Sequence, residues 1–154
     1  MAGAPWNDAR DVLGEVAEMA KDFNADGLDI YFLNDDHTRL DARDKHSVDT
    51  VFKVVRPSGQ TPTGSRLQDL FNIYVPHLDP RRSKPIVFVV ITDGAPTDDP
   101  EAIIVSTARR LEERNIPLRM VGVQFIQIGD DPGATAALKK LDDGLARIYG
   151  IRVR

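Results

Sequence analysis

The sequence contains no cysteine, no long apolar run and no cluster of basic residues. The absence of cysteine excludes disulfides and thiolate metal sites. No apolar run reaches membrane-spanning length, and the N-terminus lacks the pattern of a signal peptide. Lys and Arg total 20 against 24 acidic residues, and the resulting net charge of -4 argues against a general nucleic-acid binder. We therefore expect a cytoplasmic protein whose partners are neither membranes nor nucleic acids.

Several common catalytic patterns are also missing. The chain has no Ser, His and Asp in a hydrolase order, no phosphate-binding Gly-Lys-Ser/Thr loop and no dinucleotide-binding Gly-x-Gly-x-x-Gly motif. Its three histidines (His37, His46 and His77) fall on different expected elements, without the spacing of metal ligands. The 154 residues, 42% of them hydrophobic, suit one globular domain of ordinary size. We expect a protein that is not an enzyme.

The most informative segment is Ile86-Val-Phe-Val-Val-Ile-Thr-Asp-Gly94. A run of apolar, mostly β-branched residues predicts a strand buried on both faces, as in the middle of a parallel sheet. Asp93 follows where this strand leaves the sheet. In open α/β sheets, ligands bind at the carboxyl ends of the strands. Asp93 is therefore a candidate site residue.

The remaining chain alternates between helical and strand patterns. Apolar spacing predicts helices at about residues 5–23, 48–55, 63–78, 100–115 and 134–141. We expect Asp99 to be the N-cap of the fourth helix, and Trp6 and Phe23 to pack in the core. Strands are expected at about residues 28–33, 86–92, 118–128 and 148–153. Residues 34–45 are expected to be irregular, apart from a short edge strand near residues 38–40. This order predicts an α/β fold with a mostly parallel sheet and helices on both faces.

A second polar segment, Gly59-Gln-Thr-Pro-Thr-Gly64, precedes the helix expected at 63–78. Together with Thr92-Asp-Gly94 it resembles the von Willebrand factor A (vWA) domain. In that family three loops build a metal-ion-dependent adhesion site (MIDAS): an Asp-x-Ser-x-Ser loop, a Gly-x-Thr-x-Thr loop and an Asp at the end of a buried strand. The resemblance implies that Thr61 and Asp93 are metal ligands. It covers residues 6–143, implies a Rossmann-like fold, and is closest to intracellular fungal members in residues 122–131.

The chain departs from the family at the first of these loops, because it contains no Asp-x-Ser-x-Ser motif. The resemblance therefore implies a single vWA-like domain over residues 1–154 that is truncated at its N-terminus and lacks the central first strand. Removing a central strand leaves unpaired backbone groups, which are costly when buried. We expect marginal stability or self-association through the gap in the sheet.

The missing loop also weakens the metal site. Mg²⁺ takes six oxygens in near-octahedral geometry, so Thr61 and Asp93 would leave about four positions to water. We expect magnesium binding in the millimolar range at best, or none. In the family, an open metal position accepts an acidic residue from a partner protein. The resemblance thus implies a protein-interaction domain with an incomplete adhesion site.

Simpler roles remain open for these residues. Thr61 precedes Pro62 and is also suited to be the N-cap of the following helix. Asp93 before Gly94 also fits a plain turn. Thr63 fits a first-turn helix residue or a supporting hydroxyl better than a direct ligand. The acidic pairs that precede two expected helices would serve the starts of those helices: Asp98 and Asp99, and Asp130 and Asp131.

Two alternative functions stay open as well. One is a degenerate or truncated domain with no metal-dependent binding. The other is a metal-dependent phosphoryl-transfer enzyme that uses Asp93. An Asp at the end of a strand resembles the haloacid dehalogenase motif. That motif needs a second Asp two residues later, where this chain has Ala95.

Overall fold

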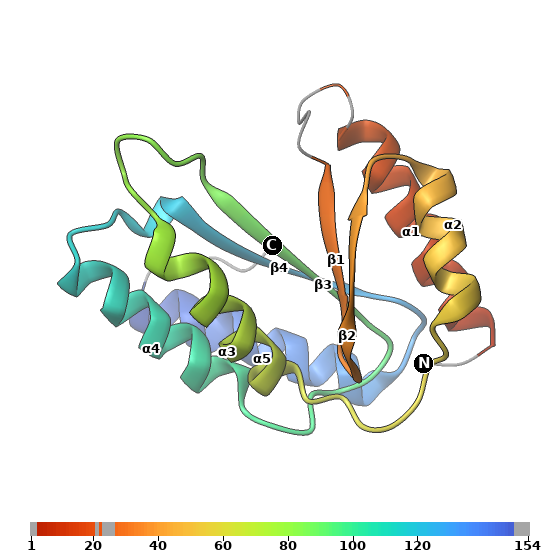
Figure 1. Cartoon of the computed structure of the whole chain (residues 1–154). Helices are drawn as coiled ribbons and strands as arrows, with labels where there is room; N and C mark the ends of the chain where they lie inside the picture. Colours follow the sequence, from red (N-terminus) through yellow and green to blue (C-terminus); the bar gives the residue numbers. More distant parts are fainter. Residues whose placement is uncertain (1–2, 21, 23–26, 150–154) are drawn as a thin grey trace. The chain divides into compact units, whose positions relative to one another are not determined.

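The protein is a mixed α/β structure, described by a computed structural model at residues 3–20, 22 and 27–149 (Figure 1). It divides into two compact units, residues 1–60 and 61–154. Each unit contains one two-stranded sheet, antiparallel in the first and parallel in the second. Among the described residues, no helix has the length and apolar character needed to cross a lipid bilayer.

The first unit packs two helices, α1 (Ala4–Ala20) and α2 (Lys45–Val54), with a hairpin of β1 (Leu28–Phe32) and β2 (Asp35–Ala42). The strands pair antiparallel from Leu28↔Ala42 to Phe32↔Asp35, with a register shift near the turn. The expectation that residues 34–45 are mostly irregular is therefore wrong. Backbone pairing with β1 makes this polar segment a strand, although it lacks the apolar run that marks β3.

The core of the first unit lies between the hairpin and the two helices. Its buried members are Ala17, Ile30, Ala42 and Val48. Trp6 packs against Phe32 and Phe52, with ring centroids 5.7 and 4.6 Å apart, but it is half-buried and is not one of the buried residues of this core. Helix α1 ends at Ala20 rather than near residue 23, and Phe23 lies outside the described residues.

The second unit begins with α3 (Thr63–Tyr74) and contains β3 (Ile86–Thr92), α4 (Pro100–Glu113), β4 (Val121–Gln127) and α5 (Pro132–Tyr149). Strands β3 and β4 run parallel, in register from Ile86↔Val121 to Thr92↔Gln127. The ladder continues beyond them, because the Ile128 amide donates to the Thr92 carbonyl at 2.9 Å. The strand, helix and strand order over 86–127 is thus a parallel β-α-β unit, as the sequence predicts.

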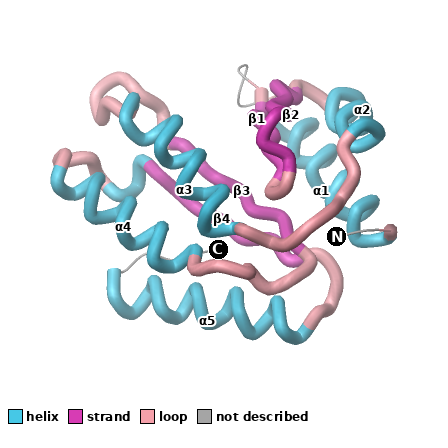
Figure 2. The backbone as a smooth tube through the Cα atoms, turned by 60° about the horizontal axis from the view of Figure 1, so that its bottom comes forward, coloured by secondary structure: helices cyan, strands magenta, loops and turns pink. Residues whose placement is uncertain are grey.

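Helices α3, α4 and α5 gather on one face of this parallel pair (Figures 1 and 2). Phe88 of β3 is buried in the core that they form and packs edge-on against Phe71, with centroids 5.0 Å apart. On the other face of β3, Val87 is 62% and Val89 is 41% exposed. The expectation that this strand is buried on both faces is therefore wrong for these two residues, because no described helix of the same unit covers them.

Two boundaries in the second unit also differ from expectation. Helix α3 ends at Tyr74 and passes into a 3₁₀ turn, Val75–His77, that contains a proline. A second 3₁₀ turn, Leu118–Met120, precedes β4, so the strand starts three residues later than expected.

Helix α5 continues to Tyr149, well past its expected end, so the strand expected at 148–153 is wrong for its first two residues, and the rest lies outside the described residues. Gly144 does not stop α5. It faces the side chain of Glu101 on α4, since a Cβ built there would stand 2.7 Å from the Glu101 Oε1 atom.

Candidate functional site

The two segments that carry the predicted site residues lie side by side at the carboxyl end of β3. The Thr97 amide donates to the Thr61 carbonyl at 2.9 Å, which ties the loop after β3 to the loop before α3. A Cβ built on Gly94 would stand 3.9 Å from the Thr61 hydroxyl oxygen. Thr61 and Asp93 are both half-buried. The structure therefore brings together the two loops that the sequence singles out.

Thr92 is the last residue of β3, and it is only 1% exposed. Its hydroxyl donates to the Gly94 carbonyl at 3.0 Å and accepts from the Gly94 amide at 3.3 Å. These bonds fold the backbone sharply around Asp93. A fixed turn reduces the conformational freedom that Asp93 would lose on binding a ligand.

Asp98 fastens this loop to the start of α3. Its carboxylate accepts from the amides of Gly64 and Ser65, both at 2.7 Å, and from the Ser65 hydroxyl at 2.9 Å. Partial burial alone would raise the pKa of Asp98, but the hydrogen bonds from Ser65 and Gly64 outweigh it and lower that pKa. The prediction that Asp98 serves the start of α4 is wrong, because this carboxylate caps α3 instead.

The neighbouring residues take the simpler roles. Asp99 is the N-cap of α4, accepts from the Ala102 amide at 3.1 Å and precedes Pro100, as predicted. The N-cap role considered for Thr61 is wrong, because the N-cap of α3 is Pro62 and makes no side-chain capping bond. Thr61 contributes its carbonyl instead, which accepts from the Thr63 amide at 2.8 Å. Thr63 is fully buried as the first residue of α3.

A third loop emerges at the same end of the parallel pair, since Ile128 lies beside Thr92 in the extended ladder. Asp131 in this loop accepts from the Ala134 amide at 2.6 Å, which confirms its expected role at the start of α5. The Gln127 side chain donates to the Asp131 carbonyl at 3.1 Å and accepts from the Thr135 hydroxyl at 2.9 Å. Strand end and helix start are thereby held together.

The loops that carry Thr61 and Asp93 offer two oxygen donors for a cation. Thr61 and Asp93 offer a hydroxyl and a carboxylate, which are ligand types that Mg²⁺ accepts, yet about four of its six positions would fall to water. Within residues 3–20, 22 and 27–149, no three His, Cys, Asp or Glu side chains are grouped so that they could hold a metal ion.

Comparison of the chain with protein-family models, curated proteins and solved structures returns no match. The resemblance to the vWA domain therefore rests on the residue pattern alone. The role of Asp98 escaped the sequence pattern, because its partners lie 33 and 34 residues away along the chain. An acidic residue next to an N-cap residue is the only local signal, and it points to the wrong helix.

Proposed function

We propose that this protein is a non-enzymatic protein-interaction domain of the vWA type, and that its contact surface lies at the carboxyl end of β3. The observation that carries the proposal is the convergence of the Thr61 loop and the Asp93 turn, tied by the bond from Thr97 to Thr61. Two further features support it: the exposed Thr97 beside the turn, and the exposed Asp130 in the third loop. Exposed polar groups on loops that a rigid scaffold positions are typical of binding surfaces.

The proposal includes the architecture that the resemblance implies, which is a Rossmann-like, mostly parallel sheet without the family's first strand. The parallel pairing of β3 with β4 and the intervening α4 are consistent with that arrangement. The partner would be a protein that presents an acidic residue. Magnesium would assist only weakly, since Thr61 and Asp93 supply two oxygens of the six that the ion requires.

A second copy of the chain is another partner within this proposal. Val87 and Val89 form an exposed apolar strip on β3, and the seven residues of that strand carry no charge, proline or glycine. Strand β3 pairs with β4 along one edge, and the described residues show no partner strand along its other edge. Uncharged apolar strands with an open edge favour strand-to-strand association.

A capture experiment with four arms tests the interaction surface. Immobilised wild-type protein, wild type with a chelator, Asp93→Ala and Asp69→Ala would be exposed to the same extract. Asp69 is an exposed acid on α3 and serves as the matched control. We expect polypeptides that the wild type and Asp69→Ala retain and that Asp93→Ala loses. Retention that depends on neither the chelator nor Asp93 would remove the metal-assisted form of the proposal.

A further inference from the structure

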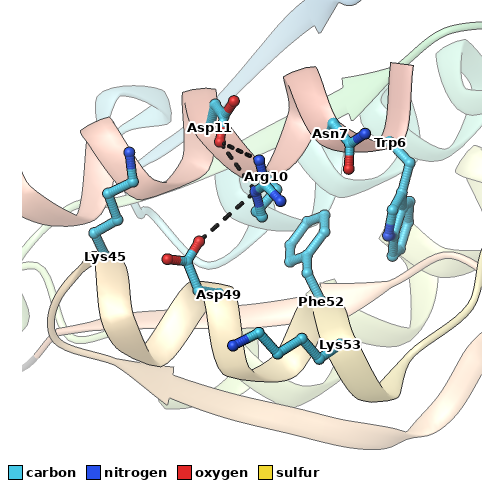
Figure 3. A pocket seen from close by; sticks show the side chains of 8 residues that line it. All are labelled: Trp6, Asn7, Arg10, Asp11, Lys45, Asp49, Phe52 and Lys53. Carbon is cyan, nitrogen blue, oxygen red and sulfur yellow. Dashed lines mark hydrogen bonds and ion pairs between the residues drawn. The ribbon is translucent and has the colours of Figure 1, made fainter. Parts of the chain in front are cut away.

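A pocket of about 310 Å³ lies between α1 and α2, within the first unit (Figure 3). Trp6 and Phe52 form its aromatic wall, with ring centroids 4.6 Å apart and planes tilted by 41°. Phe32 supports both rings from behind, at 5.7 Å from Trp6 and 5.5 Å from Phe52. Three mutually packed rings give this wall a fixed shape, and an aromatic surface of this kind accepts a flat ring in stacked or edge-on contact.

The charged side chains of the pocket are not balanced. Arg10 is held by Asp11, with its two nitrogens 3.0 and 2.8 Å from one carboxylate oxygen, and lies 3.7 Å from Asp49. The single positive charge of Arg10 offsets only one of the two acids, so the excess positive charge of the lining comes from its two lysines. Lys45 and Lys53 also line the pocket and are exposed, and neither ammonium group forms an ion pair with another described residue. Three cationic and two anionic side chains leave the lining with a net positive charge.

We infer that this pocket binds a small planar anion, namely one aromatic ring that carries one phosphate or carboxylate group. The ring would rest on Phe52 and Trp6, and the acid would pair with Lys53, which follows Phe52 directly on α2. Lys45 stands eight residues earlier, or about 12 Å along the helix axis, so it does not reach the same acid group.

The size and the charge of the pocket both select this class of ligand. A volume of about 310 Å³ lies at the lower end of the range for small-molecule sites, which favours a single ring over a larger cofactor. A cationic ligand would meet three positive side chains and two carboxylates, both of which lie within 4 Å of Arg10. The wall and the free lysine together therefore specify an aryl anion.

The chain carries its own reporter for this test, because Trp6 is its sole tryptophan and lines the pocket. The probe is phenyl phosphate, titrated against the full chain while the Trp6 fluorescence is recorded. We expect a saturable change with a Kd of roughly 1–10 mM, the scale expected for a ligand of so few atoms. Inorganic phosphate, which lacks the ring, and benzyltrimethylammonium, which has the opposite charge, should each give a much smaller change. Equal responses to phenyl phosphate and to the cation would overturn the inference.

Two substitutions with opposite expected effects on binding distinguish a specific loss of binding from a folding defect. Lys53→Met keeps the length of the side chain and removes its charge, and should weaken phenyl phosphate binding about two- to fivefold, the scale of an exposed ion pair. Asp49→Asn removes one acid beside Arg10 and should strengthen binding by a similar factor, a gain that a damaged fold would not produce. Lys139→Met, an exposed lysine on α5, is the matched control and should bind like the wild type. If Lys53→Met matches Lys139→Met, or if Asp49→Asn weakens binding, the assignment is wrong.

Discussion

Replacing Asp98 with alanine should loosen the link between the loop after β3 and the start of α3. The carboxylate accepts three hydrogen bonds there, from the amides of Gly64 and Ser65 and from the Ser65 hydroxyl. Removing a side-chain acceptor from a helix N-terminus costs about 0.5–2 kcal/mol of unfolding free energy. Because Asp98 is only partly buried, water replaces part of these bonds in the variant. We expect a loss of about 1–2 kcal/mol, or roughly 2–8 °C in Tm for a chain of this size.

The loss should depend on pH in a defined direction. The hydrogen bonds hold the pKa of Asp98 below its ordinary value of 3.8 in the folded protein. A carboxyl group with a lowered folded pKa contributes stability that is fully present above 3.8 and is lost as the pH falls from there through the folded pKa. Asp98→Asn keeps one side-chain oxygen but no charge, so its stability should lack this acid-dependent component.

Urea unfolding followed by circular dichroism, at neutral pH and at several acidic pH values, measures both effects. Asp69→Ala is the matched control, because Asp69 is an exposed acid further along α3. Amide hydrogen exchange gives a local measurement, since the Gly64 and Ser65 amides should exchange faster once their acceptor is gone. Equal unfolding midpoints for Asp98→Ala and Asp69→Ala, with unchanged exchange at residues 64 and 65, would refute the assignment of Asp98 as the cap of α3.

Two further predictions concern stability and association. The hydroxyl of Thr107 is buried on α4 and has no hydrogen-bond partner among the described residues. Thr107→Val should therefore leave stability unchanged or raise it by up to about 1 kcal/mol in urea unfolding. A clear destabilisation would show that the hydroxyl has an acceptor. Val87→Thr with Val89→Thr keeps the branched shape of both side chains and makes the exposed strip of β3 polar. The double variant should be more monomeric than the wild type in sedimentation velocity at matched concentration, and a wild type that is monomeric at every concentration would contradict self-association through β3.

The parts of the fold that the sequence predicts well are those whose cause is local. The apolar run over residues 86–92 marks β3, and the pair Asp99-Pro100 marks the start of α4, because a cap residue and the helix that it caps are neighbours in the chain. The parallel pairing of β3 with β4 follows from the helix between them. The Thr61 loop precedes α3 and the Asp93 turn follows β3, and the two meet at the carboxyl end of β3.

The features that escaped prediction depend on contacts between distant segments. Strand β2 has a polar sequence without an apolar pattern of its own. It is a strand because its backbone pairs with β1. Helix α5 runs through Gly144, and Leu145 just beyond it is fully buried in the core of the second unit. The partner helix of Asp98 and the exposure of Val87 and Val89 likewise depend on packing that no short window of sequence records.

We propose that Thr61 and Asp93 form one surface that retains part of an adhesion-type metal site. The most direct test is a magnesium titration followed by ¹H–¹⁵N NMR, with wild type, Asp93→Asn and Asp69→Asn compared. We expect chemical-shift changes confined to amides near Thr61, Gly94 and Thr97, with a Kd of about 1 mM or weaker. The same changes should occur in Asp69→Asn and should be absent in Asp93→Asn. Micromolar affinity would contradict the claim that the site is incomplete. Shifts that are the same in Asp93→Asn and in the wild type would contradict the claim that Asp93 belongs to a metal site.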